Sequence, residues 1–253
     1  MNIKDLIISQ LDKQRQYNID NYAGYFRASG SGSCLKKRYL LNQNVEASDE
    51  QSDASKITLM FGTAVHSELE QLVKEAVKQV DYLESLHEIR LVNHNFKLTG
   101  QFDMLLKNNE TKTITIVDFK TAHSGKQKYV NERGVDYHYK LQIATYYKLL
   151  NSSDTKIVRF QDELVYEIPI SSVPFLRDAH NYKWFGKVVY LYRDSALIDE
   201  LEFAIDENLI KSVERELEQL KNIETIIKNI KYDYNNWQCK YCQFKTKCKN
   251  GEV

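Results

Sequence analysis

Apolar residues recur along this chain with two spacings, one typical of helices and one typical of strands. A helical spacing predicts helices over residues 2–17, 34–41, 61–80, 137–151 and 206–231. Short runs rich in Ile, Val, Leu and Phe predict strands over residues 86–95, 97–106, 112–120, 157–168 and 185–192. Because a meander of three strands is enclosed between helices, this order indicates a mixed α/β core.

The composition indicates how large a core the chain can bury and in which cellular compartment we expect it. With 253 residues, 42% of them hydrophobic and only two prolines, the chain can bury one large core, and we expect one domain over residues 1–253. Lysine plus arginine and aspartate plus glutamate both number 35, so no global charge indicates a polyanionic partner, although local basic patches can still form. The segment MNIKDLIISQLDKQRQ lacks the layout of a signal peptide, and no apolar run is long enough to span a membrane. We therefore expect a cytoplasmic protein without a membrane partner.

In that compartment, its four cysteines are expected to be free thiols, metal ligands or redox groups rather than disulfides.

Charged residues interrupt the most apolar hairpin of the chain, TGQFDMLLKNNETKTITIVDFKTA. Asp118 and Lys120 point to the same face of their predicted strand, and Ile114 and Ile116 share that face. One interpretation is that these charges, with Asp103 on the preceding strand, are solvated on the outer face of a half-exposed sheet. The other is that the two carboxylates and the ammonium converge at one end of the sheet. Two carboxylates so close together repel each other unless a cation neutralises them, and hard oxygen ligands favour Mg²⁺ or Mn²⁺.

Four short motifs appear in a fixed order around this hairpin. They are His66 in FGTAVHSELEQ, Gly100-Gln-Phe-Asp103, Asp118-Phe-Lys120 and Gln142-Ile-Ala-Thr-Tyr146. This series resembles the H…GxxD…(D/E)xK…QxxxY series of the PD-(D/E)XK nuclease superfamily, in its RecB-like branch. The resemblance implies a restriction-endonuclease-like α/β fold, in which helices flank a mixed central sheet. Position 118 is Asp where many relatives have Glu, and the pattern accepts both.

The resemblance also implies a role for each residue. Asp103, Asp118, His66 and the carbonyl group of Phe119 would hold the metal ion. Lys120 would orient the attacking water or neutralise charge on the phosphorus, and Gln142 and Tyr146 would position the strand or the lysine. Glu70 and Glu88 can assist metal binding, but solvated side chains are the favoured interpretation of both.

The cysteines add a second feature. Cys239, Cys242 and Cys248 form a C-x2-C-x5-C cluster, and Cys34 stands alone about two hundred residues earlier. A tetrahedral zinc site is one interpretation of such cysteines. The arrangement of one early and three late cysteines resembles the iron–sulfur nucleases of the same branch, namely the Cas4-like CRISPR-adaptation exonucleases and the AddB and Dna2 types. That resemblance implies a [4Fe–4S] cluster held by segments 29–44 and 232–250.

The resemblance to these nucleases also implies a substrate and partners. Lys36, Lys37, Arg38 and Tyr39 follow the first cysteine, where relatives have basic residues near DNA. We therefore expect a metal-dependent exonuclease of bacterial, archaeal or phage origin that acts on single-stranded DNA or on DNA with free ends. It would work with a protein partner in recombination, repair or CRISPR adaptation. The alternative is a catalytically weak or inactive DNA-binding subunit of such a complex, but the intact Asp103, Asp118 and Lys120 favour the enzyme.

Overall fold

The computed structural model of the protein describes residues 2–20, 22–49, 51–161, 164–233 and 235–252. The chain divides into two compact units. The first, here called the sheet unit, comprises Arg27–Gly32 and Ala64–Leu217; the second, here called the terminal unit, comprises Met1–Phe26, Ser33–Thr63 and Glu218–Val253. Within the described segments, no helix is long and apolar enough to cross a membrane.

A mixed β-sheet forms the core of the sheet unit. Its strands follow the order β6 (Leu164–Pro169), β5 (Thr155–Gln161), β2 (Leu83–Asn93), β3 (Leu98–Asn108), β4 (Thr113–Ala122), β7 (Lys183–Tyr192) and β8 (Ile198–Ala204), and the two-residue β1 (Phe26–Arg27) also pairs with β3. β4 and β7 pair in parallel, whereas the other neighbours in the main order are antiparallel. Parallel strands need a long crossover, which α4 (Gly125–Arg133), α5 (Tyr137–Leu150), β5 and β6 provide here. The chain therefore has the mixed α/β architecture that its pattern predicts.

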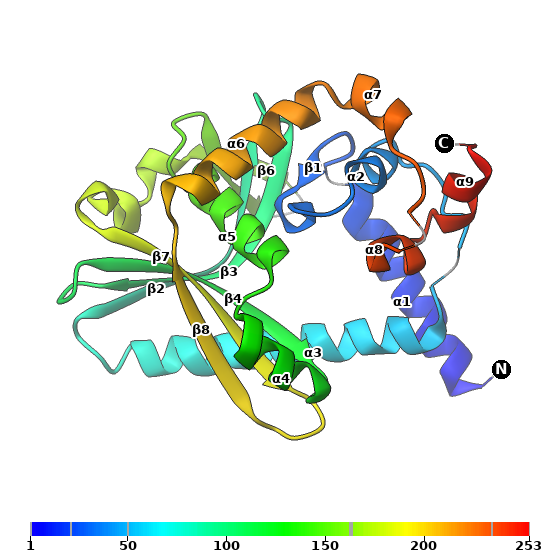
Figure 1. Ribbon diagram of the computed structural model, residues 1–253. Coiled ribbons are helices and arrows are strands. Elements are labelled where there is room, and N and C mark those ends of the chain that lie inside the picture. The colour runs from blue at the N-terminus through cyan, green and yellow to red at the C-terminus, as the bar shows by residue number, and fades with distance from the viewer. Residues whose placement is uncertain (1, 21, 50, 162–163, 234, 253) are drawn as a thin grey trace. The chain divides into compact units, whose positions relative to one another are not determined.

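Helices cover both faces of this sheet (Figure 1). They are the second part of α3 (Asp53–Val77), α4 (Gly125–Arg133), α5 (Tyr137–Leu150) and most of α6 (Glu207–Lys221), with short 3-10 turns η1 (Ala28–Gly30), η2 (Ile170–Ser172), η3 (Pro174–Leu176) and η4 (Ala179–Asn181). On one face, Ile143 of α5 packs so close to Gly186 of β7 that a methyl group there would lie 2.7 Å from it. On the other face, Leu69 of α3 packs against the buried cluster of Met104, Val117, Phe119 and Val189. Gly186 pairs with Ile116 of β4, whereas Phe119 of β4 belongs to the cluster under α3. Because even- and odd-numbered residues of a strand point to opposite faces, α5 and α3 cover opposite faces of β4.

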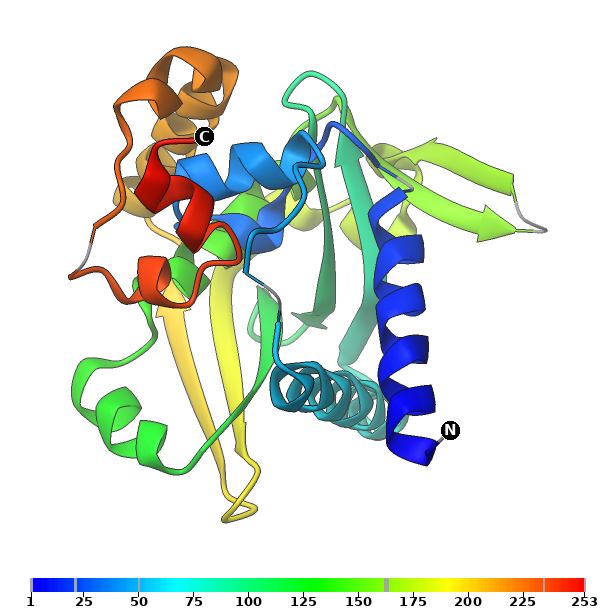
Figure 2. The same cartoon turned by 90° about the vertical axis from the view of Figure 1, so that its right-hand side faces the viewer.

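The terminal unit brings together segments from both ends of the sequence. Its helices are α1 (Ile3–Asp20), α2 (Leu35–Asn42), the first part of α3, α7 (Ile223–Ile226), η5 (Ile227–Asn229), α8 (Trp237–Lys240) and α9 (Lys245–Asn250). The backbone N–H groups of Ser48 and Asp49 both donate to the carbonyl oxygen of Gln243 at 3.0 Å. The Asp49 carboxylate accepts the backbone N–H of Thr246 at 2.8 Å. α2 lies beside α8 and α9, as Figure 2 shows, so residues about two hundred positions apart become neighbours.

Two predictions from the pattern are wrong in detail, and one strand was not predicted. The strand predicted over 157–168 is two strands that form the hairpin of β5 and β6. Strand β8 was not predicted, although Leu201 and Phe203 alternate there with exposed glutamates. The helix predicted over 206–231 ends at Lys221 and restarts as α7, with Asn222 as the residue that caps the second helix. Leu209, Val213 and Leu217, which share one side of α6, are buried.

Candidate active site and cysteine cluster

The hairpin of β3 and β4 sets Asp103 and Asp118 at neighbouring positions. Its antiparallel ladder runs as far as the pair Met104 and Val117. The next position in the same register places Asp103 beside Asp118, at the point where regular pairing of the two strands stops. The structure therefore brings together two carboxylates that are fifteen positions apart in the sequence. They lie at the end of the paired part of the hairpin and not on a solvated outer face of the sheet.

A hydrogen bond and an ion pair fix the Asp118 carboxylate. The residue is 2% exposed, and its Oδ1 accepts a hydrogen bond from Gln142 Nε2 at 3.0 Å. Lys120 Nζ lies 2.7 Å from Asp118 Oδ2 and 5.0 Å from the centre of the Tyr139 ring. Burial alone would lower the pKa of Lys120, but the carboxylates of Asp118 and Asp103 outweigh burial and raise it. Lys120 is therefore a charged ammonium whose position two residues from Asp118, on the same strand face, follows directly from β geometry.

Asp103 stands on the other side of this pair, toward α3. Its Oδ2 accepts the backbone N–H of Phe119 at 2.7 Å and lies 3.6 Å from His66 Nδ1. Burial, together with the nearby Asp118 carboxylate, raises the pKa of Asp103 to about 7. The protein without metal therefore resists ionising both carboxyl groups, which is the electrostatic signature of a site that needs a cation.

His66 is in the protonation state that a metal ligand requires. It lies on α3, and burial together with the charge of Lys120 lowers its pKa, so its imidazole is neutral at physiological pH. Its ring also packs edge-on against the ring of Phe119, with 6.0 Å between the ring centres. A neutral imidazole next to an aspartate suits a divalent cation, with the aspartate as the hard ligand and the imidazole as an auxiliary one.

Tyr146 and Gly100 have a positioning role in this arrangement. The Tyr146 hydroxyl donates a hydrogen bond to the carbonyl oxygen of Gln101 at 2.7 Å, two residues before Asp103. A Cβ atom on Gly100 would lie 2.6 Å from Ala28 Cβ and 2.8 Å from Tyr146 Cε1, so only glycine allows this close approach. Burial raises the pKa of Tyr146, which keeps its hydroxyl a donor. Tyr146 therefore anchors the strand that carries Asp103, and Gln142 holds Asp118.

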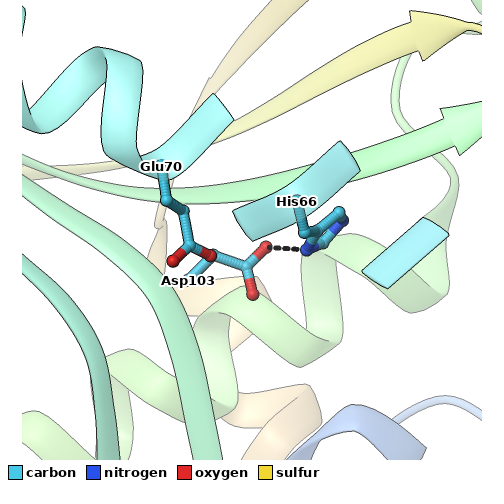
Figure 3. Close-up of side chains that lie close together, drawn as sticks. All are labelled: His66, Glu70 and Asp103. Atoms are coloured by element: carbon cyan, nitrogen blue, oxygen red, sulfur yellow. Dashed lines mark ion pairs between the residues drawn. The ribbon is translucent and has the colours of Figure 1, made fainter. Parts of the chain in front are cut away.

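One residue of the site was misjudged from the sequence. Glu70 was interpreted as part of a solvated helix face, but it is 7% exposed and points toward Asp103 (Figure 3). Burial and the neighbouring Glu88 and Asp103 raise the pKa of Glu70 to about 8. Its position one helical turn after His66 was the available signal, since residues four apart share a helix face.

The donor set fits a hard divalent cation. It combines carboxylate oxygens of Asp103 and Asp118 with one imidazole, and Mg²⁺ and Mn²⁺ prefer oxygen ligands. The buried Oε1 of Glu70 has no hydrogen-bond partner among the described residues, which is the state expected of an oxygen that a cation would satisfy.

The four cysteines lie together in the terminal unit. Cys34, Cys239, Cys242 and Cys248 line one small pocket and form no disulfide with one another. The backbone N–H of Phe244 donates to Cys242 Sγ at 3.4 Å, and the backbone N–H of Cys34 donates to the side chain of Gln238 at 3.1 Å. Burial raises the pKa of Cys242 and of Cys248, so a cofactor that binds thiolates would have to remove these protons.

The basic segment after Cys34 is only partly available for contacts. Lys36 is 8% exposed and donates to the carbonyl oxygen of Ile230 at 3.1 Å, and Arg38 is 5% exposed with its guanidinium 5.9 Å from the centre of the Phe26 ring. Lys37 and Tyr39 are partly exposed. Lys37 and Tyr39 are therefore the more accessible of the four residues that are expected near DNA.

Replacing Asp103 by asparagine is expected to stabilise the metal-free protein. An acid whose pKa is raised on folding loses stability as the pH rises through its folded value, here about 7. Asparagine keeps an oxygen for the Phe119 N–H and carries no charge. At pH 8 in EDTA we expect Asp103→Asn to raise the free energy of unfolding by roughly 1–3 kcal/mol, with the difference shrinking toward pH 5. Urea denaturation measures it.

The control for this experiment is Asp194→Asn. Hydrogen bonds from Ser124 lower the pKa of Asp194, so neutralising it should bring no gain at pH 8. If Asp103→Asn unfolds at pH 8 with a free energy equal to or lower than that of the wild-type protein, the repulsion between Asp103 and the neighbouring carboxylates is contradicted.

Comparison with known proteins relates this chain to a family of nucleases. Residues 74–249 match the family model of the PD-(D/E)XK nuclease superfamily, a range that includes Asp103, Asp118 and Lys120 but begins after His66. The CRISPR-associated exonuclease Cas4 of Saccharolobus solfataricus is 23% identical over 190 residues, which are 75% of this chain and 70% of that protein. The crystal structure of SSO0001 superposes with a TM-score of 0.58 at 16% identity, covering 98% of this chain and 97% of that one, and it supports the same fold.

Proposed function

Because the chain belongs to the PD-(D/E)XK nuclease superfamily and therefore to the metal-dependent nucleases that act on DNA, we propose that it is an exonuclease acting on single-stranded DNA or on DNA ends. The observation that carries this proposal is the meeting of Asp103, Asp118 and Lys120 at one end of the β3–β4 hairpin, beside His66. The name of the Saccharolobus relative, an exonuclease, supports action from a free end.

The residues at this end of the hairpin divide the chemistry of hydrolysis between them. Asp103, Asp118 and the carbonyl group of Phe119, with the imidazole of His66, would hold Mg²⁺ or Mn²⁺. Such an ion, when bound, supplies Lewis acidity and lowers the pKa of a bound water. Gln142 keeps Asp118 oriented, and Tyr146 keeps the Asp103 strand in place.

Lys120 contributes positive charge at the reacting phosphate. Its ammonium stays protonated because the Asp118 and Asp103 carboxylates raise its pKa despite burial. A fixed ammonium in a buried site stabilises the charge that develops on phosphate oxygens and needs no reorganisation during the reaction. Its ion pair with Asp118 fixes where that charge is delivered.

For the four cysteines we propose a [4Fe–4S] cluster rather than zinc. A zinc ion with Zn–S bonds of about 2.3 Å brings its sulfurs to about 3.8 Å from one another. Among the described residues, possible metal-ligand atoms of His, Cys, Asp and Glu gather within 4.8 Å of one another at His66, Glu70 and Asp103. Three cysteine sulfurs do not form a group of this kind within the same described residues. The four cysteines line one pocket, which supports a cofactor that all four share.

For the DNA contacts and partners the support is narrower. Lys37 and Tyr39 combine a cation with an aromatic ring, the two groups with which proteins follow a single strand and stack its bases. We propose that they contact DNA and that the enzyme works with a protein partner in recombination, repair or CRISPR adaptation. A catalytically inactive DNA-binding subunit is the alternative, and the complete set of Asp103, Asp118 and Lys120 disfavours it.

A nuclease assay on the full chain tests the proposed function. We expect single-stranded DNA to be shortened from an end in Mg²⁺ or Mn²⁺ and to stay intact in EDTA, because the carboxylate site needs its cation. Strands blocked at the 5′ end, the 3′ end or both report which end is used. Closed circular single-stranded DNA is the control for cleavage inside a strand. Rapid cleavage of the circle would contradict the exonuclease assignment, and intact DNA under all metal conditions would favour the inactive subunit.

A further inference from the structure

Cations and an exposed aromatic ring lie side by side on α4, the helix that follows the strand of Asp118 and Lys120. Its sequence GKQKYVNER places Lys126, Tyr129 and Arg133 three and four positions apart, so the three side chains form one stripe along the helix. Tyr129 is 41% exposed, and the guanidinium carbon of Arg133 lies 4.9 Å from the centre of its ring. The stripe therefore presents an aromatic ring between two cations at the surface.

The stripe begins beside the lysine of the proposed active site. The Nζ atom of Lys126 lies 5.3 Å from the centre of the Tyr139 ring, and the Nζ atom of Lys120 lies 5.0 Å from the centre of the same ring. An ion pair of 2.6 Å with Asp136 holds Lys126 in this position. Because all of these residues belong to the sheet unit, their arrangement is fixed within one compact body. A strand whose phosphate meets Lys120 can therefore continue along α4.

The charges of α4 differ between its two sides. Lys128 is two residues after Lys126, so it lies on the opposite side of the helix, where it is 3.9 Å from the carboxylate of Glu132. These two opposite charges balance each other, and the remaining cations of the helix both lie in the stripe. The buried Val130 and the hydrogen bond from Gln127 to Asp199 of β8, at 3.1 Å, attach α4 to the sheet unit. The stripe is therefore a positively charged surface on an anchored helix.

This combination of groups suits a single nucleic-acid strand, because cations contact its phosphates and aromatic rings stack on its bases. Lys126 and Arg133 lie about 10 Å apart along the helix axis, roughly the length of three nucleotides. We propose that Lys126, Tyr129 and Arg133 bind the DNA strand next to the reacting phosphate, with Tyr129 stacked on a base. The inference rests on the proposed nuclease function. It gives the sheet unit a strand-binding surface of its own, whereas Lys37 and Tyr39 belong to the terminal unit.

The salt dependence of DNA binding tests the roles of the cation and the ring separately. Binding of fluorescein-labelled oligothymidylate to the full chain is measured by fluorescence anisotropy, in EDTA to prevent cleavage and at several salt concentrations. We expect Arg133→Ala to weaken binding and to reduce the slope of log K against log salt by about 0.7, the value for one phosphate contact with a single strand. Tyr129→Ala should weaken binding by about fivefold or more without changing the slope, because stacking releases no counterion. Tyr129→Phe keeps the ring and should bind as the wild-type protein does.

Lys128→Ala is the matched control, because it removes one positive charge from the opposite side of the same helix. Its affinity and salt slope should equal those of the wild-type protein. If Arg133→Ala changes binding no more than Lys128→Ala does, or if Tyr129→Ala binds as tightly as the wild-type protein, the stripe on α4 does not bind the strand. Degradation of DNA ends by the wild-type protein would then leave the proposed function standing. If the wild-type protein neither binds nor cleaves DNA, both the inference and the proposed function fail.

Discussion

Asp118→Ala is expected to abolish DNA cleavage, with a loss of at least about a thousandfold in rate. The substitution removes a carboxylate that is 2% exposed and leaves Lys120 and Gln142 without their shared partner. Asp103→Ala and Lys120→Ala should abolish cleavage to the same extent. The aspartate variants should also lose bound metal, whereas Lys120→Ala should keep it, because an ammonium is not a metal ligand. Initial rates on end-labelled DNA and Mn²⁺ titrations measure the two effects separately.

Glu200→Ala is the matched control for these variants. Glu200 pairs with Lys187 on an exposed part of the sheet, and an exposed ion pair contributes little to stability. Cleavage by this variant should equal that of the wild-type protein. Appreciable cleavage by a folded Asp118→Ala would show that the carboxylate pair is not the catalytic centre. His66→Ala should retain more activity than the aspartate variants, since imidazole is an auxiliary ligand for a hard cation.

Cys34→Ala is expected to destabilise the protein as much as Cys248→Ala, although the two residues lie more than two hundred positions apart. A cofactor that joins them closes a long loop and restricts the unfolded chain, which is worth roughly 2–5 kcal/mol by analogy with a disulfide. Protein purified without air should be brown and absorb broadly near ~400 nm, as expected of thiolate-ligated iron–sulfur clusters. Both variants should lose the colour. Denaturation midpoints and absorption spectra, measured on the same samples, test the two effects together.

Tyr241→Ala is the control, because Tyr241 lies between two of the cysteines and is 85% exposed. It should keep both the colour and the stability of the wild-type protein. Colourless protein with one equivalent of zinc after anaerobic purification would favour the zinc interpretation. Zinc that appears only after purification in air would not, since thiolates freed from a decayed cluster bind Zn²⁺ readily.

The sequence was sufficient to find the residues that meet at the hairpin, because a strand has a strict period. Asp118 and Lys120 are two residues apart, so their common face follows from geometry, and a short hairpin forces Asp103 to the level of Asp118. Gly100 could also be interpreted in advance as part of a motif. Its physical reason, the contact with Tyr146 and Ala28, became visible only in three dimensions.

The features that were missed depend on what packs against each residue. Glu70 lies on a helix with acidic neighbours, and only the position of β3 reveals that this residue is on the buried face of the helix. Lys36 and Arg38 were expected near DNA because their segment resembles one that lies near DNA in relatives. Their burial was not foreseen, since the sequence does not reveal whether a long basic side chain is exposed or folded against the chain. Strand β8 carries the alternation of a half-exposed strand, with Leu201 and Phe203 between the exposed Glu200 and Glu202, but it is short and was passed over.

The joining of early and late segments in the terminal unit has a consequence for the timing of synthesis. At roughly 5–20 residues per second, Cys34 is made about 10–40 s before Cys239. Nearly all of the sheet unit, from Ala64 to Leu217, is made in that interval. Its strands can therefore pair before the last three thiols exist, and Cys34 must wait as a reduced thiol on the nascent chain. Loading of the proposed cofactor then becomes a late step of maturation, which depends on the supply of iron and sulfide after the nuclease core has formed.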